Sequence, residues 1–201
     1  MAQQRSEETK RKIQIAAEAL FCESGYEATS VDAICRMAQV TKGAFYHHYP
    51  SKQALFLNLI YYWLETLDMG FQVAIQNATS VPDAFQQMAE QMDLIYNHGP
   101  NRLPLLLEFY NQATRDPVIW EATVEPYHKY VSNFATMVRK GIAEGSLAPI
   151  DPDLAARIIV SLGAGLVMQG LMDPHHTNWG EVAREGVAHL LAGLQYPRID
   201  E

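Results

Sequence analysis

The chain has 201 residues, of which 48% are hydrophobic and 19% are charged, and its formal net charge is −8. This composition excludes an intrinsically disordered chain and fits one or two soluble domains with a sizeable core. The opening residues, MAQQRSEETKRK, contain no apolar signal segment, and the longest apolar run, residues 158–172, is shorter than the roughly 20 residues that a membrane span needs. We therefore expect a cytoplasmic protein that has no membrane partner.

The charge is divided unevenly along the chain. Residues 1–52 contain seven Lys or Arg and six Asp or Glu, which gives +1, whereas residues 53–201 contain eight and seventeen, which gives −9. A small basic face in the first part can bind DNA through phosphate contacts even when the whole protein is acidic. By itself, this pattern is also that of an ordinary acidic cytosolic protein with a polar N-terminal segment.

Apolar residues recur at helical spacing in almost every segment, and this periodicity predicts an all-α fold. The first helix covers about residues 6–24 and ends at Gly25, which suits a left-handed C-cap. Thr29 or Ser30 caps a second helix, and Thr41 caps a third. Further helices are predicted over residues 51–76, 83–97, 102–115, 117–144, 152–172 and 179–195.

Three of the later helices have clearly marked starts. Asp116 and Asp151 each precede a proline at the first helical position, and Asn178 followed by Glu181 has the form of a capping box. Pro126 lies inside the predicted helix 117–144. We expect it to kink or split that helix, because proline removes a backbone hydrogen bond.

The most informative segment is TKGAFYHHYPSK, residues 41–52. It combines a capped helix start, tyrosine and histidine side chains and two lysines. The helix before it has an apolar face made by Val31, Ile34, Cys35 and Ala38. Two helices of this length that are joined by a short turn are typical of a helix-turn-helix, whose second helix reads DNA.

Residues 9–55 resemble the N-terminal DNA-binding domain of TetR/AcrR-family transcriptional regulators. The resemblance rests on an ordered series of residues: Phe21, Gly25, Tyr26, Thr29, Ser30, Val31, Ile34, Ala38, Val40, Thr41, Lys42, Gly43, Phe45, Tyr46, Tyr49, Ser51, Lys52 and Leu55. Gln39 departs from it, since the family usually has glycine in this turn, and we expect strain or an altered turn there. The resemblance implies an N-terminal three-helix helix-turn-helix domain over residues 1–52 and a helical effector-binding and dimerisation domain over residues 53–201.

The resemblance also implies which residues contact double-stranded operator DNA. Lys42 opens the recognition helix, Gly43 and Ala44 let that helix approach the floor of the major groove, and Phe45 faces inward. We expect Tyr49 to fill the core. The predicted DNA contacts are Thr29, Ser30, Thr41, Lys42, Gly43, Ala44, Tyr46, His47, His48 and Lys52.

A second prediction concerns a homodimer, because two recognition helices must be held roughly 34–36 Å apart to read successive half-sites. Small and apolar residues form stripes on the last two predicted helices, and small residues permit close helix packing. The predicted interface residues are Ala156, Ile159, Gly163, Val167, Gly170, Ala183, Gly186, Leu190 and Gly193. The alternative is that these stripes face the protein's own core.

The middle of the chain is rich in aromatic residues and methionine, which line sites for apolar or amphipathic small molecules as readily as they build cores. The predicted effector-binding residues are Tyr62, Met92, Tyr96, Phe109, Asn111 and Tyr130. We therefore expect a ligand-responsive repressor that an effector of unknown identity releases from a palindromic operator. A helical small-molecule carrier or interaction protein that does not bind DNA is the alternative.

Catalytic chemistry finds no support in the sequence, which shows no HExxH motif, no spaced Cys/His cluster and no Gly-rich phosphate loop. We expect no enzyme activity and no cofactor. His47 and His48 are adjacent and point about 100° apart on a helix, so we expect no metal site there. Cys22 and Cys35 fit reduced core thiols, and a redox role for either stays open.

Overall fold

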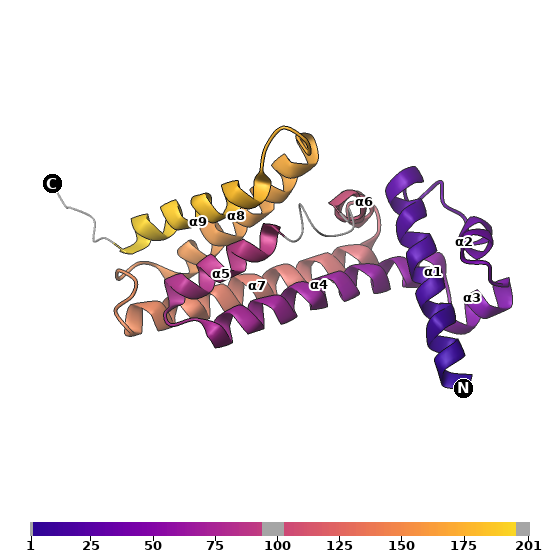
Figure 1. Ribbon diagram of the computed structural model, residues 1–201, viewed down its shortest axis with the longest axis horizontal. Coiled ribbons are helices and arrows are strands. Elements are labelled where there is room, and N and C mark those ends of the chain that lie inside the picture. The colour runs from indigo at the N-terminus through magenta and orange to yellow at the C-terminus, as the bar shows by residue number, and fades with distance from the viewer. Residues whose placement is uncertain (1, 94–102, 196–201) are drawn as a thin grey trace. The chain divides into compact units, whose positions relative to one another are not determined.

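A computed structural model describes residues 2–93 and 103–195, and every regular element in these two ranges is a helix (Figure 1). The predicted all-α fold is confirmed. The helices are α1 Ala2–Ser24, α2 Val31–Ala38, α3 Lys42–His48, α4 Lys52–Asn77, α5 Val81–Asp93, α6 Leu103–Ala113, α7 Pro117–Ala143, α8 Pro152–Met172 and α9 Trp179–Gln195.

The helices belong to two compact units. Unit 1 consists of Met1–Glu65 and Arg102–Thr123, and unit 2 consists of Thr66–Asn101 and Val124–Glu201. The boundary between residues 65 and 66 falls inside α4, and the boundary between residues 123 and 124 falls inside α7. Unit 1 is therefore larger than the predicted segment of residues 1–52, because it also contains α6 and the first turns of α7.

The helix starts that the sequence marks are present. The Asp116 carboxylate accepts a hydrogen bond from the Val118 amide (2.8 Å), and the Asn178 side-chain oxygen accepts one from the Glu181 amide (3.3 Å). Gly25 ends α1 with φ +80°, a left-handed conformation that glycine adopts at little cost.

Of the predicted kink or split at Pro126, the split is wrong, because α7 continues through this residue, while the kink stays a prediction. A proline inside a helix costs roughly 3 kcal/mol through the lost hydrogen bond and ring clash. Buried side chains hold the helix on both sides of it, at Ala122 and at Val131. Tertiary packing of this kind supplies most helical stability in proteins and outweighs the local preference.

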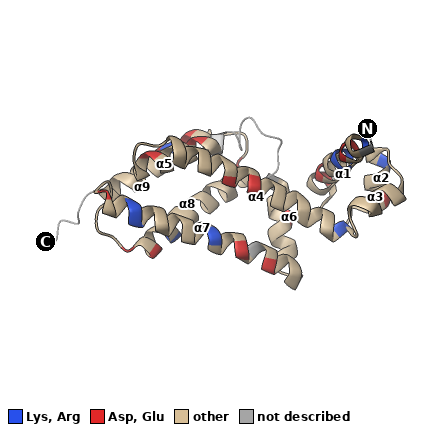
Figure 2. Cartoon of the chain, turned by 90° about the horizontal axis from the view of Figure 1, so that it is seen from below, with Lys and Arg blue, Asp and Glu red and all other residues tan. Residues whose placement is uncertain are grey.

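Charges of both signs lie along the helices, and α1 carries blue and red residues side by side (Figure 2). Residues 2–24 contain four Lys or Arg and four Asp or Glu, a net charge of 0. Lys12 and Glu8 form an ion pair of 3.0 Å on this helix. α1 therefore adds little net positive potential to unit 1.

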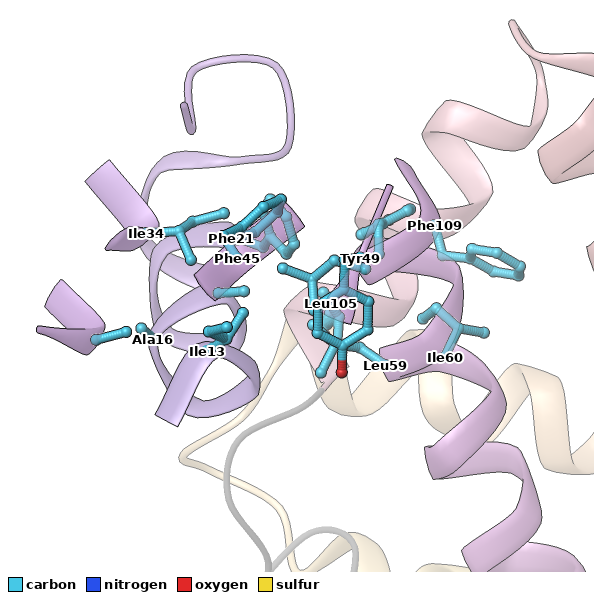
Figure 3. Close-up of a cluster of buried hydrophobic side chains, with 14 of the residues drawn as sticks. Ile13, Ala16, Phe21, Ile34, Phe45, Tyr49, Leu59, Ile60, Leu105 and Phe109 are labelled. Carbon is cyan, nitrogen blue, oxygen red and sulfur yellow. The ribbon is translucent and has the colours of Figure 1, made fainter. Parts of the chain in front are cut away.

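Unit 1 has one contiguous apolar core, to which α1, α2, α3, α4, α6 and the start of α7 contribute (Figure 3). The Phe56 ring lies edge-on to Phe21, with ring centres 5.3 Å apart, and 6.0 Å from the Phe109 ring. Fully burying a side chain of this size contributes about 1.5–3 kcal/mol. The three N-terminal helices therefore share their core with α6, which is why α6 belongs to unit 1.

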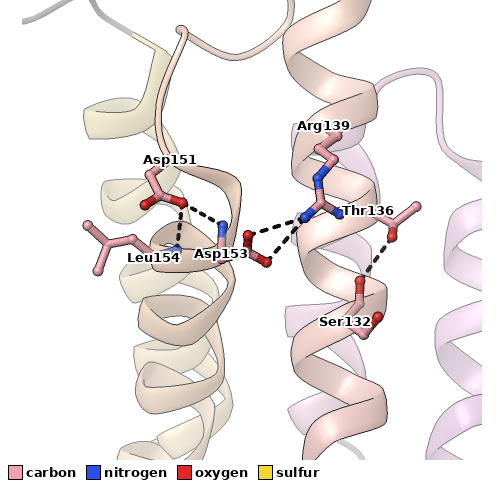
Figure 4. A network of polar contacts seen from close by, with 6 residues as sticks. All are labelled: Ser132, Thr136, Arg139, Asp151, Asp153 and Leu154. Carbon is pink, nitrogen blue, oxygen red and sulfur yellow. Dashed lines mark hydrogen bonds and ion pairs between the residues drawn. The ribbon is translucent and has the colours of Figure 1, made fainter.

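Unit 2 has its own apolar core, which α4, α5, α7, α8 and α9 build around Val138 and Leu191. At its surface, Nη2 of Arg139 on α7 donates to both carboxylate oxygens of Asp153 at 3.2 and 3.3 Å (Figure 4). The Asp151 carboxylate caps α8 by accepting from the amides of Asp153 (2.9 Å) and Leu154 (3.2 Å). This network fixes the start of α8 against α7.

One helix of the described residues, α8, is long and apolar enough in length and composition to cross a membrane, with a mean hydropathy of 1.7 and 22% of that window buried. A row of residues runs along it at alternating steps of four and three residues, and all of them except the half-buried Gly165 are exposed: Leu154, Ile158, Ser161, Gly165, Met168 and Met172. Such spacing is that of a helix that packs lengthwise against another helix. We call these six residues the α8 seam.

Candidate nucleic-acid interface

Helix α2 begins at a capping serine and ends in a left-handed turn. The Ser30 hydroxyl accepts a hydrogen bond from the Ala33 amide (3.1 Å). Gln39 has φ 55° and ψ 44°, a region that ordinarily favours glycine, and its amide donates to the Arg36 carbonyl (3.2 Å). The strain that the sequence predicts at Gln39 is confirmed.

Helix α3 is anchored by two buried aromatic residues, Phe45 and Tyr49. The prediction that Phe45 faces inward and the prediction that Tyr49 fills the core are both confirmed. The Tyr49 hydroxyl donates to Oδ1 of Asn58 (3.1 Å), which also accepts from Nε2 of Gln14 (2.9 Å). Burial raises the pKa of Tyr49 to about 12, so this residue stays a neutral donor. The Thr41 hydroxyl caps the helix start by accepting from the Ala44 amide (3.1 Å).

The opposite side of α3 is exposed at Lys42, Gly43, Tyr46 and His47. Tyr46 keeps 53% of its surface accessible although it is a large aromatic side chain. A Cβ at Gly43 would lie 3.8 Å from Oγ1 of Thr41, an ordinary contact, so packing within the chain does not require glycine there. A bare backbone at this place instead lets an external surface approach closely.

Two family models match the chain, one over the helix-turn-helix just described and one over the C-terminal part. The model of the bacterial regulatory proteins of the tetR family matches residues 14–59, and the model of the BetI-type transcriptional repressor C-terminal region matches residues 97–195. The chain belongs to the TetR family. It is a ligand-responsive, DNA-binding transcriptional regulator of the repressor type.

Individual relatives agree with this assignment. The chain is 27% identical over 203 residues to the A-factor receptor protein of Streptomyces griseus, which covers 98% of this chain and 67% of that protein. It is 25% identical to the HTH-type transcriptional regulator UidR of Escherichia coli K12, over 82% of this chain and 83% of UidR. The fold matches a TetR transcription regulator from Haloarcula marismortui with a TM-score of 0.81 at 17% identity, over 94% of this chain and 98% of that one.

For Thr29, the structure of this TetR-family regulator gives a different role from the predicted DNA contact. Its side chain is 3% exposed, and its hydroxyl donates within hydrogen-bond distance of the carbonyls of Gly25 (2.8 Å) and Leu20 (3.2 Å). A short polar side chain near a helix start can donate a hydrogen bond either to a backbone carbonyl of its own chain or to a ligand. Here the Thr29 hydroxyl donates to carbonyls at the end of α1. Thr29 is a structural residue, which corrects the prediction.

Lys52 also differs from its predicted role as a phosphate contact. Its ammonium donates to the carbonyls of Tyr26 (2.7 Å) and Thr29 (3.0 Å) and lies 4.1 Å from the centre of the Tyr26 ring. Burial lowers the pKa of Lys52. This lysine therefore braces the start of α4 against the loop before α2, and we remove it from the contact set.

Asp32 is a residue of this surface that the sequence analysis does not single out. Its Oδ1 lies 2.6 Å from Nζ of Lys42, so it pairs with the first residue of the recognition helix. The sequence distinguishes this residue, because Asp32 is the one acidic residue between Glu27 and Glu65.

The predicted effector-binding residues that the structure describes are divided between the two units. Phe109 is a core residue of unit 1 with 3% exposure, and its role in effector binding stays a prediction. Tyr62 and Asn111 are exposed and belong to unit 1, whereas Tyr130 belongs to unit 2, where its ring centre is 6.1 Å from that of Phe71. Tyr96 and the Met92 side chain lie outside the described residues.

A small cavity in unit 2 does not serve as the predicted effector pocket. Its volume is about 60 Å³, and it is lined by Ile75, Ala78, Thr79, Ser80, Val81, Ala84, Met137, Lys140 and Glu144. None of the predicted effector residues is among them. Sites for drug-sized ligands usually measure roughly 300–1,000 Å³, so this cavity is too small for one.

The predicted dimer stripe is partly internal. Ala156 and Ala183 are fully buried, and Gly170 is buried as well. A Cβ at Gly186 would lie 3.8 Å from Cδ1 of Leu162, so this glycine faces α8 of the same chain. Small residues favour close packing against any helix, and here part of the stripe packs α9 on α8. The assignments of Ala156, Gly170 and Ala183 to the dimer interface are corrected. The α8 seam lies on another side of the helix. Of the other predicted interface residues, Ile159, Gly163, Val167, Gly186 and Leu190 are half-buried and Gly193 is exposed.

Proposed function

We propose that this regulator binds a palindromic operator as a homodimer, with the exposed side of α3 in the major groove, and that a small apolar or amphipathic effector releases it. In this proposal, the contact set is Ser30, Thr41, Lys42, Gly43, Ala44, Tyr46, His47 and His48. Residues 1–52 carry the DNA-binding role, and residues 53–201 carry the effector-binding and dimerisation roles. The target genes lie in the cytoplasm, where the protein acts.

The exposed side of α3 is the observation that carries the proposal. Phe45 and Tyr49 fix the helix from behind, while Lys42, Tyr46 and His47 point polar groups outward. Cations and hydroxyls suit phosphate oxygens and base edges, and Gly43 keeps the backbone free for close approach. A carrier protein has no use for a polar, anchored helix of this kind.

The α8 seam supports the dimer. Met172 keeps 79% of its surface exposed, Leu154 56% and Ile158 42%, and Val182 of α9 keeps 38%. Apolar groups in such a row are unfavourable in water, and a second copy of the same helix would cover them about a twofold axis. Gly163 and Gly165 have no atom within 4 Å of a built Cβ, which leaves room for a partner helix.

Helix α4 supports the coupling between effector and operator. It begins in unit 1 at Lys52 and continues in unit 2 to Asn77. An effector that binds better when this helix is tilted would oppose operator binding, and the opposition is reciprocal. Effector affinity that stays constant at saturating operator DNA would exclude this scheme.

Selection from a pool of random duplexes, followed by a gel mobility shift, tests the DNA-binding part of the proposal. We expect an inverted repeat whose half-sites are about one helical turn apart. Tyr46→Ala should weaken binding to the selected duplex by roughly tenfold, as for loss of a contact of about 1–3 kcal/mol. Tyr61→Ala is the matched control, because Tyr61 is similarly exposed on α4. A protein that retards no duplex would instead support the carrier alternative.

A further inference from the structure

The recognition helix starts with a lysine that is already paired within the chain. Nζ of Lys42 lies 2.6 Å from Oδ1 of Asp32, and the two side chains are 62% and 52% exposed. Lys42 is the first residue of α3, and Asp32 lies in the first turn of α2. The ion pair therefore spans the turn between these two helices, at the surface that faces the DNA.

The ion pair between Lys42 and Asp32 contributes little to the free energy of folding. Exposed ion pairs contribute almost nothing to folding, since water screens them and both side chains lose freedom. Asp32 is well placed at the positive end of α2, whereas a lysine at the positive end of α3 is poorly placed. The hydrogen bond to Asp32 raises the pKa of Lys42, which stays cationic with its charge locally neutralised.

The charges around the pair sharpen this point. Arg36 follows Asp32 by four residues on α2, so both lie on one face of that helix. Lys52 donates to two carbonyls within unit 1. Lys42 is the one lysine or arginine of α3. Its ion pair with Asp32 therefore determines how strongly α3 attracts a phosphate.

We propose that Asp32 determines DNA specificity by restraining Lys42, so that it weakens binding to random DNA more than binding to the operator. This inference rests on the proposed placement of α3 in the major groove. A phosphate can capture Lys42 only by displacing the Asp32 carboxylate, which then faces the negative DNA without a partner. Non-specific binding consists almost entirely of such phosphate contacts, whereas at the operator the base contacts of α3 hold the helix while the Lys42–Asp32 pair stays closed, so the restraint costs random DNA more.

The first test measures salt-dependent binding of Asp32→Asn to a random-sequence duplex of about 30 base pairs and to the selected duplex. We expect affinity for the random duplex to rise about three- to tenfold at low salt, with the slope of log K against log salt steeper by about 0.9, the share of one phosphate. The ratio of selected to random affinity should fall. Glu23→Gln is the control, because it removes an exposed carboxylate of α1 and should change neither quantity.

A double-mutant cycle with Lys42→Met separates the possible roles of Asp32. In the Lys42→Met background, Asp32→Asn should have almost no effect on random DNA. An equal effect in both backgrounds would overturn the proposal, because Asp32 would then repel DNA by its own charge. Unchanged random-DNA affinity in Asp32→Asn alone, with a lowered melting temperature, would make the pair merely structural and would also overturn it. If Lys42→Met alone leaves binding to both duplexes intact, Lys42 contacts no phosphate and this inference fails, whereas the placement of α3 in the major groove fails only if Tyr46→Ala also leaves binding intact.

Discussion

The ammonium of Lys52 lies 2.7 Å from the carbonyl oxygen of Tyr26 and 4.1 Å from the centre of the ring of the same residue. Lys52 is the first residue of α4, and Tyr26 precedes α2. The pair therefore fixes the helix-turn-helix to the helix that continues into unit 2. The donors of its ammonium are thus engaged within unit 1, at the carbonyls of Tyr26 and Thr29.

Lys52→Met should destabilise the protein, because methionine keeps the apolar stem and removes the donors to Tyr26 and Thr29. Hydrogen bonds from a charged group contribute about 1.5–3 kcal/mol, and we expect a loss of that size in urea unfolding. Lys12→Met is the control, since Lys12 pairs with Glu8 at an exposed site and should change stability by less than about 0.5 kcal/mol. Unchanged stability in Lys52→Met, together with weaker DNA binding, would restore Lys52 to the contact set.

Gln39→Gly should stabilise the protein. The left-handed conformation costs a residue with a Cβ about 1–2 kcal/mol, and glycine loses about 0.5–1 kcal/mol of backbone entropy on folding, so a net gain of about 0.5–1 kcal/mol is expected. Gln39→Ala keeps the Cβ and should bring no gain. Urea unfolding of the three proteins measures the difference, and a destabilised Gln39→Gly variant would mean that the glutamine side chain stabilises the turn.

Local signals in the sequence predict the elements of this fold well. Capping at Ser30, Thr41, Asp116 and Asp151 depends only on residues within one helical turn. These helix starts can therefore be predicted from the sequence alone. The direction of a polar side chain does not depend on neighbours alone. Thr29 and Lys52 turn inward because of carbonyls up to 26 residues away, which no local pattern reveals.

Periodicity has a similar limit. It identifies a stripe of small residues on α8 and α9 but cannot tell whether the stripe faces the same chain or a partner. Ala156 and Ala183 pack inside the unit, while the exposed seam with Met168 lies on another side of α8. The grouping of α6 with unit 1 also rests on contacts distant in sequence, such as Phe56 with Phe109.

His48 should make stability depend on pH. Burial lowers its pKa, His47 and Lys10 lower it further, and Glu7 opposes this. Below the ordinary pKa of 6.5, His48 takes up a proton more readily in the unfolded chain than in the folded protein. The stability that the neutral His48 contributes is therefore fully present above pH 6.5 and is lost as pH falls through the folded pKa. Unfolding at about pH 7.5 and about pH 5 should therefore show a smaller loss in His48→Asn than in the natural protein. The exposed His175 provides the control, since His175→Asn should keep the full loss; an equal loss in all three proteins would contradict the prediction.

Met168→Glu should convert the dimer to a monomer in sedimentation equilibrium. Met168 is an exposed apolar residue of the α8 seam, and a carboxylate there would be buried without a partner in the interface. Val118→Glu makes the same change at a comparably exposed apolar residue of unit 1 and should leave the dimer intact. A natural protein that sediments as a monomer, or a Met168→Glu variant that stays dimeric, would refute the seam as the interface.

Site-specific photo-crosslinking tests the central placement of α3 most directly. Benzoyl-phenylalanine replaces Tyr46 in one protein and Tyr61 in another, because both tyrosines are about half exposed, on α3 and on α4. Irradiation with the selected duplex should crosslink DNA through the probe at Tyr46 and leave the probe at Tyr61 unreacted. Crosslinks from Tyr61 without any from Tyr46 would contradict the placement of α3 in the major groove.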